Sequence, residues 1–245
     1  MKYEIKIGHL FSDLLNMFGD KGNIASLVNR MKWRGYSAET VCFKEQDEIC
    51  FDGLDIVILG GGGEKDELSA LKKLMEKKEE LKAYVESGGI LLAFCGGFRM
   101  LGQYFKTKTQ TVEGVGILDM ETEYGERFIG NVIAETEITG EKIKIAGFEN
   151  HGGRTILKGI RPFAYILSGE GNNGEDKTEG AIYKNVIGTY LHGPLLPKNP
   201  RLTDYILKVA LERKYGETIC LCPLSDELEN EALGFAINRF LKAEG

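Results

Sequence analysis

The chain has 245 residues, of which 42% are hydrophobic and 28% are charged, a length and composition typical of one large globular domain with a sizeable core. Its formal net charge is −6 and no block of Lys and Arg occurs, so a nucleic-acid partner is not expected. The longest apolar runs are too short to span a bilayer and the N-terminus lacks the apolar core of a signal peptide, so we expect a cytoplasmic protein without membrane insertion.

The first hundred residues alternate between strand-like and helix-like patterns. We expect strands at residues 2–9, 41–43, 55–59 and 90–94. Helices are predicted at residues 22–34, where Asp20 could cap the first turn, and at residues 65–86, where leucines recur at helical spacing. This alternation is typical of a parallel sheet covered by helices.

The chain becomes rich in glycine and in short β-type runs between residues 114 and 191. We expect these runs to add strands, some antiparallel, that extend or flank the sheet. Helices return at about residues 200–214, with Pro200 in the first turn, and at about residues 225–242. No linker rich in Pro, Gly or Ser occurs, so we predict one domain over residues 1–245. The expected fold is α/β with three layers: a mostly parallel central sheet, flanking helices and additional antiparallel strands.

One cysteine ends an apolar strand in the run LLAFCGGF, residues 91–98. The two glycines after Cys95 permit a strained strand-to-helix turn that presents a nucleophile at its tip. A helix beginning near Phe98 would direct its N-terminal dipole at the sulfur and lower the pKa of the thiol. Backbone N–H groups of the turn could stabilise an oxyanion. We predict that Cys95 is a nucleophile; a buried cysteine before a glycine turn is the alternative.

Four glycines at residues 60–63 follow the strand-like run DIVIL. A phosphate-binding P-loop would need the pattern GxxxxGK[ST], whereas EKDE follows here, and its acidic side chains would repel phosphate. The spacing of a dinucleotide-binding loop is not met either. We predict that this loop adds N–H groups to the oxyanion site; a flexible turn is the alternative.

Three histidines, His9, His151 and His192, are candidates for the base that a thiol nucleophile needs. His192 follows the strand-like run VIGTYL and precedes Gly193-Pro194, so it ends a strand much as Cys95 does. His151 lies in a polar, glycine-rich segment that is interpreted as a loop, where it could contact substrate or have a structural role. We favour His192 as the base; a structural role is the alternative.

The five cysteines are odd in number and irregular in spacing, which does not favour a disulfide framework. Cys220 and Cys222 would supply only two of the four ligands that zinc requires, and no histidine lies near them in the sequence. We therefore expect no metal site and no cofactor bound to this chain.

The segments VILGGG, LLAFCGGFRMLG and GTYLHGP together resemble the class I glutamine amidotransferases. Within that family the chain is most similar to the cobyric-acid-synthase-like glutaminases. The segments NMFGDKGNI, GFENHGGRT and LHGPLLPKN narrow the similarity to glutaminase subunits that work with a Mur-ligase-like (MurT) synthetase. The resemblance runs from about residue 5 to about residue 215.

This resemblance implies hydrolysis of L-glutamine to L-glutamate and ammonia through a thioester on Cys95. His192 would act as the base, and the N–H groups of Gly62 and Gly96 would hold the oxyanion. Arg127 would bind the α-carboxylate of glutamine; a surface arginine is the alternative. The ammonia would pass to the Mur-ligase-like partner, which would bind ATP and Mg²⁺ and amidate the D-glutamate of lipid II to D-isoglutamine. The resemblance thus implies a cytoplasmic heterodimer in peptidoglycan synthesis.

Two positions depart from the family pattern. Many members carry a Glu two residues after the histidine, whereas Pro194 occupies that position here, so the motif lacks the acid that orients the base. We therefore expect a weakly active free subunit, with the partner supplying or positioning this acid. Arg99 occupies a position, four after the cysteine, at which a Gln usually lines the glutamine site.

Three other functions fit the same residues. The chain could be a cysteine peptidase or γ-glutamyl hydrolase on the same fold, a glutaminase subunit for a cobyrinate-type or other acceptor, or a regulatory subunit without catalysis. The intact pair of Cys95 and His192 argues against the last of these. The acceptor would bind the partner, so this sequence leaves its identity open.

Overall fold

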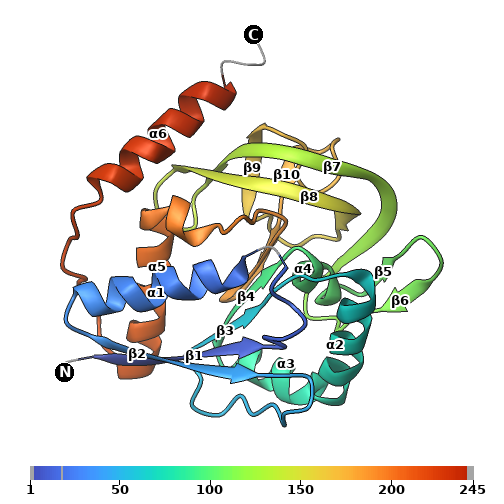
Figure 1. Cartoon of the computed structure of the whole chain (residues 1–245), viewed down its shortest axis with the longest axis horizontal. Helices are drawn as coiled ribbons and strands as arrows, with labels where there is room; N and C mark the ends of the chain where they lie inside the picture. The colour runs from blue at the N-terminus through green and yellow to red at the C-terminus, as the bar shows by residue number, and fades with distance from the viewer. Residues whose placement is uncertain (1–2, 18, 242–245) are drawn as a thin grey trace.

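The computed structural model describes residues 3–17 and 19–241. Its strands form two sheets, one in the lower half of Figure 1 and one above it. Most helices surround the lower sheet (Figure 1). The first residue of the predicted strand 2–9 and the last residue of the predicted helix 225–242 lie outside the described residues.

The first sheet has the strand order β11-β12-β4-β3-β1-β2 and is parallel except for β11. Its strands are β1 (Glu4–Leu10), β2 (Ser37–Phe43), β3 (Ile56–Leu59), β4 (Ile90–Phe94), β11 (Ala181–Tyr183) and β12 (Val186–Thr189). Every residue of β3, β4 and β12 is buried, because helices or the second sheet cover both faces. Burial on both faces explains why these strands are continuous apolar runs in the sequence.

Helices cover both faces of the first sheet. α1 (Asp20–Trp33) and α5 (Pro200–Tyr215) pack on one face, and α2 (Glu64–Glu76) and α3 (Lys78–Glu86) pack on the other. The side chains of β3 divide between these layers: Ile56 and Ile58 join one core cluster, and Val57 and Leu59 join the other. This division follows from the alternation of side chains along a strand. The predicted three-layer α/β fold is therefore confirmed.

The glycine-rich middle of the chain forms a second sheet. β7 (Met120–Thr136) and β8 (Ile143–Leu157) pair antiparallel over most of their length, with a register shift between Tyr124 and Phe128. The other strands of this sheet are β5 (Tyr104–Lys106), β6 (Thr111–Glu113), β9 (Ala164–Ser168) and β10 (Thr178–Glu179). Of the strands between residues 114 and 191, β11 and β12 extend the first sheet, and the rest build a sheet that packs beside it.

Two predictions about helices are wrong. Residues 65–86 form two helices rather than one, because the backbone of Lys77 turns away at φ −109° and ψ 16°. Asp20 does not cap α1: Gly19 occupies the cap position, and the carboxylate of Asp20 instead accepts the N–H of Gly61 in a neighbouring loop. The glycine cap is compatible with the left-handed backbone at that position, where φ is 82°.

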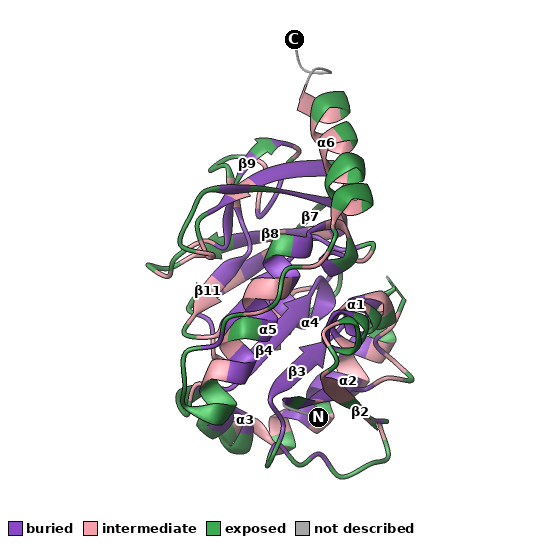
Figure 2. Cartoon of the chain, turned by 90° about the vertical axis from the view of Figure 1, so that its left-hand side faces the viewer, coloured by how far each residue is buried: buried purple, intermediate pink, exposed green. Residues whose placement is uncertain are grey.

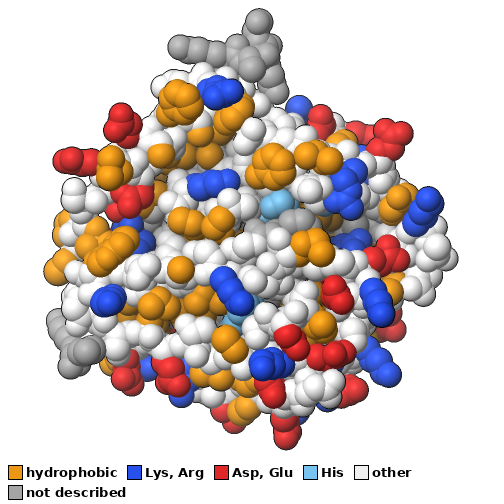
Figure 3. Space-filling model, in the orientation of Figure 1, with side chains coloured by type: hydrophobic (Ala, Val, Ile, Leu, Met, Phe, Trp, Pro, Cys, Tyr) orange, Lys and Arg blue, Asp and Glu red, His pale blue; other side chains and the backbone are white. Residues whose placement is uncertain are grey.

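The C-terminal helix α6 (Glu227–Leu241) lies outside the layers, and none of its residues is buried (Figure 2). A short 3₁₀ helix, η1 (Leu196–Lys198), precedes α5. On the face drawn in Figure 3, acidic, basic and hydrophobic side chains are interspersed. Within residues 3–17 and 19–241, no helix combines the length and the apolar character needed to cross a bilayer.

Candidate active site

Cys95 occupies the turn between β4 and α4 (Gly96–Met100), with φ 50° and ψ −106°. A positive φ is strained for a residue that carries a side chain. The backbone N–H of Cys95 donates to the carbonyl of Thr189 on the adjacent strand (2.8 Å), which anchors the turn. A side chain at Gly97 would overlap the carbonyl of Leu59, so this tight turn requires glycine there. The turn therefore has the geometry of a nucleophile elbow.

A cavity of about 260 Å³ lies beside the thiol. Four predicted site residues line it: Gly62, Cys95, Gly96 and Arg127. The other lining residues are Met17, Gly63, Glu64, Glu67, Arg99, Thr107, Tyr124, Asn150, His151, Gly152, Gly153 and Tyr190. The structure thus brings the elbow, the glycine loop and the β7–β8 pair together around one hollow.

A larger groove of about 990 Å³ lies away from the elbow. Charged side chains in this groove pair with neighbours on the protein, as Lys214 does with Asp55 (3.0 Å) and Lys77 with Glu80 (3.0 Å). A groove whose charges are neutralised in this way is a weaker candidate for chemistry than a cavity that contains a strained, buried thiol. We therefore place the active site at the smaller cavity.

The surroundings of Cys95 favour the thiol over the thiolate. Burial, followed by the negative charge of Glu67, raises the pKa of Cys95 to about 12, although the positive charge of Arg99 opposes the shift. The prediction that a helix dipole lowers this pKa is therefore wrong. α4 begins at Gly96 and has only five residues, so its dipole does not outweigh the desolvation of the sulfur.

His192 and Cys95 lie at the same edge of the first sheet, because each follows one of two adjacent parallel strands, β12 and β4. The backbone of His192 pairs with Phe148 through N–O distances of 3.0 and 3.2 Å. Burial, followed by the positive charges of His151 and Lys198, lowers the pKa of His192 to about 4. Among the described residues that line the cavity, His151 is present and His192 is not. The role of His192 as base stays a prediction.

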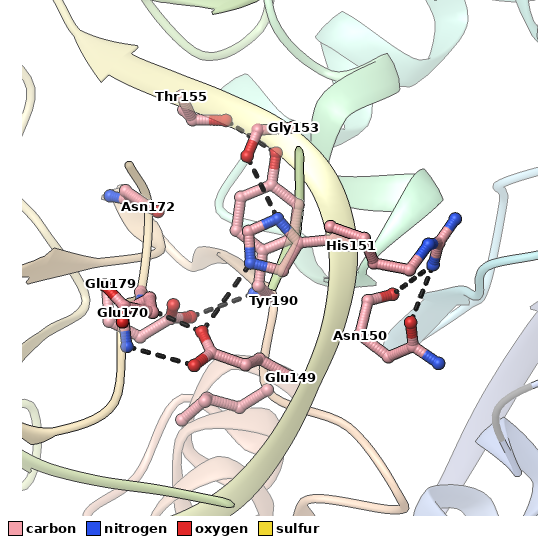
Figure 4. A network of polar contacts seen from close by, with 12 residues as sticks. Glu149, Asn150, His151, Gly153, Thr155, Glu170, Asn172, Glu179 and Tyr190 are labelled. Carbon is pink, nitrogen blue, oxygen red and sulfur yellow. Dashed lines mark hydrogen bonds and ion pairs between the residues drawn. The ribbon is translucent and has the colours of Figure 1, made fainter. Parts of the chain in front are cut away.

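His151 lies within β8 rather than in a loop, so that prediction is wrong. Figure 4 shows its imidazole stacked on Tyr190, with ring centroids 3.6 Å apart and 5° between the planes. Nδ1–H donates to the carbonyl of Gly153 (3.1 Å), and Nε2 lies 3.7 Å from Oε2 of Glu149. Glu149 in turn accepts two backbone N–H groups, at 3.0 and 2.9 Å. The ring is thus fixed as a wall of the cavity, and burial lowers its pKa.

Arg127 lies at the register shift in β7 and faces the same cavity. Its Nη1 donates to the backbone carbonyl of Asn150 (3.1 Å) and to the side-chain Oδ1 of that residue (2.7 Å). The sulfur of Cys95 lies 4.0 Å from the same backbone carbonyl. Asn150 therefore connects the predicted nucleophile with a guanidinium group, whose planar donors suit a carboxylate.

Arg99 forms an ion pair with Glu67 of α2 beside the elbow. The guanidinium donates to Oε2 of Glu67 from Nε (3.0 Å) and from Nη2, and it packs over the ring of Phe105 at 4.7 Å. The second carboxylate oxygen of Glu67, Oε1, accepts the N–H of Gly62 (3.3 Å). A charged pair therefore occupies the side of the cavity at which the family pattern places an uncharged Gln.

Two further buried carboxylates fix the strand ends around the site. Oδ2 of Asp20 accepts the N–H of Gly61 (3.3 Å), and burial raises the pKa of Asp20 to about 7. Oε1 of Glu179 accepts the hydroxyl of Thr189 (2.5 Å) and the N–H of Tyr190 (2.9 Å). Burial also raises the pKa of Glu179 to about 7. These carboxylates hold the glycine loop and the end of β12 in place.

The sequence analysis missed Glu67, Glu149 and Tyr190. Residues 149 and 151 are two apart, so on a strand their side chains share a face. A prediction of one strand over residues 143–157 would therefore have placed Glu149 beside His151. Nothing local marks Glu67, because its approach to Cys95 depends on how α2 packs against α4.

Comparisons with known proteins agree with the motifs. Residues 6–200 match the model of the CobB/CobQ-like glutamine amidotransferase domain. The chain is 44% identical over 214 residues to a Staphylococcus aureus (strain N315) protein named lipid II isoglutaminyl synthase (glutamine-hydrolyzing) subunit GatD, covering 86% of each chain. It is 36% identical over 233 residues to the subunit of the same name from Streptococcus pneumoniae (strain ATCC BAA-255 / R6), covering 94% of this chain and 89% of the relative.

A solved structure described as a glutamine amidotransferase has the same fold, with a TM-score of 0.51 at 20% sequence identity. That match covers 83% of this chain and 98% of the other. The resemblance predicted from the glycine loop, the elbow and the histidine motif is therefore confirmed.

Proposed function

Because the chain belongs to the family of CobB/CobQ-like glutamine amidotransferases, we propose that it is the glutamine-hydrolysing subunit of a lipid II isoglutaminyl synthase. It converts L-glutamine to L-glutamate and ammonia, and the ammonia amidates the D-glutamate of lipid II to D-isoglutamine. The observation that carries this proposal is the strained Cys95 elbow, which opens on a cavity shared with the glycine loop and Arg127.

The proposed reaction proceeds through a thioester. The sulfur of Cys95 attacks the side-chain amide carbon of glutamine while its proton passes to His192. The amide oxygen becomes an oxyanion that the N–H groups of Gly62 and Gly96 stabilise. His192 then protonates the leaving nitrogen, ammonia departs, and a γ-glutamyl thioester remains. A water molecule that gives its proton to His192 attacks the thioester, releases glutamate and restores the thiol.

Arg127 binds the α-carboxylate of glutamine in this proposal. The contact of its Nη1 with Asn150 directs the guanidinium toward the cavity, and the remaining N–H edge of the planar group suits a bidentate carboxylate. Loss of this contact would misplace the substrate amide relative to the sulfur, because Asn150 also contacts Cys95.

The partner in this proposal is a Mur-ligase-like (MurT-like) synthetase subunit. Both relatives are named as subunits, which supports a second chain. That chain binds ATP and Mg²⁺ and activates the acceptor carboxylate. It also supplies or positions the acid that is missing at Pro194, because the buried His192 is a weak base on its own: Glu149 raises its pKa, but burial outweighs that effect.

Ammonia release from glutamine tests the proposal, measured with wild type and Cys95→Ser, each with and without the Mur-ligase-like partner. We expect weak release by the free wild-type chain, stronger release with the partner and none from Cys95→Ser. Undiminished release by Cys95→Ser, or peptide cleavage without ammonia, would contradict it. Formation of D-isoglutamine on lipid II would identify lipid II as the acceptor. Amidation of a cobyrinate-type compound instead would refute lipid II as the acceptor.

A further inference from the structure

The carboxylate of Glu67 lies against both glycines whose N–H groups are proposed to stabilise the oxyanion, and it accepts the N–H of Gly62. Its Oε1 accepts the N–H of Gly62 at 3.3 Å. The same oxygen lies so close to Gly96 that a side chain there would overlap it. An oxyanion formed from glutamine would need the N–H of Gly62. In this conformation, a carboxylate of the protein itself therefore takes one of the two donors of the proposed oxyanion site.

The position of Glu67 is fixed by contacts on both of its oxygens. Oε2 accepts two donors from Arg99, and Oε1 accepts the N–H of Gly62. Glu67 is 3% exposed, so water does not compete for these contacts. The guanidinium of Arg99 is itself held over Phe105. The carboxylate is thus a built part of the cavity and not a mobile surface group.

The charges around the thiol come from three helices. Glu67 of α2 and Asp20 of α1 raise the pKa of Cys95, Arg99 of α4 lowers it, and the phenol of Tyr190 lies close to the same sulfur. The two carboxylates disfavour a thiolate beside them, and Arg99 offsets only part of this effect. Burial raises the pKa of Glu67 itself, and the ion pair with Arg99 opposes that shift. In its ionised form Glu67 opposes both charges that the reaction must create, the thiolate and the oxyanion.

We propose that Glu67 is a positioning residue that closes the oxyanion site in the resting chain, and that hydrolysis begins when its carboxylate leaves the N–H of Gly62. This inference rests on the proposed function. Arg99 keeps the carboxylate in the cavity during this movement, because it binds Oε2 while Oε1 leaves Gly62. The negative charge of Glu67 thus suppresses hydrolysis of glutamine when no acceptor is present.

Alkylation of Cys95 by the neutral reagent iodoacetamide tests the inference without requiring glutaminase activity. The rate is measured across pH on the full chain, by mass spectrometry of the peptide that contains Cys95. We expect Glu67→Gln to accelerate alkylation, about threefold for each unit by which the pKa of the thiol falls, because a larger thiolate fraction outweighs its lower nucleophilicity. Arg99→Gln leaves the carboxylate unopposed, so we expect slower alkylation.

Two further variants separate a charge effect from loosened packing. Asp66→Asn removes a negative charge from the same turn of α2 but does not line the cavity, so it should leave the rate unchanged. The double variant Glu67→Gln/Arg99→Gln removes the buried pair as a whole and should alkylate faster than Arg99→Gln alone. Equal or slower alkylation of Glu67→Gln than of wild type, or acceleration by Arg99→Gln, would overturn the inference.

Glutamine hydrolysis by the same variants forms the second arm. An amide oxygen accepts the N–H of Gly62 more weakly than a carboxylate does, so we expect Glu67→Gln to raise kcat of the free chain severalfold. A fall in kcat with unchanged folding would overturn the inference. If the alkylation rates follow the expected order but no variant releases ammonia, the control of the thiol by Glu67 is supported and the proposed function is refuted.

Discussion

The two residues assigned to proton transfer begin in their neutral forms. Burial raises the pKa of Cys95 to about 12 and lowers the pKa of His192 to about 4. Moving a proton from this thiol to this imidazole is uphill by roughly 10 kcal/mol before the attraction between the new charges is counted. The resting site is therefore poorly reactive, and substrate or partner must change its electrostatics.

Substitution of His151 and of His192 should separate their roles. We expect His192→Asn to lower kcat by about 10² to 10⁴-fold, the range for loss of a general base, with little change in KM. His151 is committed to Gly153, Glu149 and Tyr190, so His151→Asn should mainly raise KM by deforming the cavity wall. Steady-state ammonia release measures both. A large loss of kcat in His151→Asn with normal kcat in His192→Asn would reverse the assignment.

Asp20 should make stability depend on pH. Burial raises the pKa of Asp20 to about 7 in the folded chain, from the ordinary value of 3.8 that applies to the unfolded chain. Between these two pH values the folded state therefore keeps a proton that the unfolded state loses. Stability from this group is therefore present below pH 4 and lost as pH rises through 7. Relative to wild type, Asp20→Asn should gain up to about 4 kcal/mol between pH 4 and pH 8. Urea unfolding at several pH values measures this gain, and a constant difference would contradict it.

The elbow is an element that depends on the absence of a side chain. A Cβ at Gly97 would overlap the backbone carbonyl of Leu59, whereas a Cβ at Gly130 in β7 would meet nothing within 4 Å. We expect Gly97→Ala to cost about 1–3 kcal/mol and to remove glutaminase activity, because α4 must move away from the end of β3 to accept it. Gly130→Ala is the matched control and should be neutral in activity. Equal stability of the two variants would show that the elbow tolerates a side chain.

β3, β4 and β12 of the first sheet were predictable because they are buried on both faces and form unbroken apolar runs. β8 was obscured by glycines that close packing requires. A Cβ at Gly147 would lie 2.8 Å from Leu191 Cβ, and one at Gly153 would overlap the hydroxyl of Tyr190. These glycines resemble loop signals in a sequence, so His151 was assigned to a loop. Tertiary contacts between β8 and the segment after β12 determine that this glycine-rich segment is a strand. Local sequence patterns do not show these contacts.

At the scale of the whole molecule, a buried arginine of α1 connects that helix with two segments near the C-terminus of the chain. The guanidinium of Arg30 in α1 binds Asp204 of α5 through Nε (2.6 Å) and Nη2 (2.7 Å), and Asp226, directly before α6, through Nη1 (2.6 Å) and Nη2 (2.8 Å). These contacts hold together three segments that are far apart in the sequence. The side chain of Arg30 is 3% exposed, and these partners raise its pKa against the effect of burial.

Loss of this arginine should destabilise the whole chain. Arg30→Ala leaves Asp226 without its arginine and leaves Asp204 with Arg34 alone, so we expect a loss of about 3 kcal/mol in the free energy of unfolding. Arg201→Ala, which removes an exposed pair with Glu141, should cost no more than about 1 kcal/mol. Chemical denaturation of both variants makes the comparison. Similar small losses in both would show that the Arg30 contacts contribute little.

The family, the fold and the place of Cys95 were readable from short motifs, because the elbow and glycine loop are continuous in the sequence. The arrangement of charges around the thiol was not, because Glu67, Arg99 and Asp20 come from three helices that meet only after folding. The reactivity of the site therefore depends on long-range packing more than on its motifs.

The most direct test of the account is to trap the thioester. Wild-type chain and its partner are mixed with glutamine, quenched rapidly in acid and mapped by mass spectrometry. We predict a γ-glutamyl adduct on the peptide that contains Cys95, and none on that peptide in Cys95→Ser. Rapid ammonia release with no adduct at Cys95, or with the adduct on another residue, would contradict the central claim that this thiol is the nucleophile.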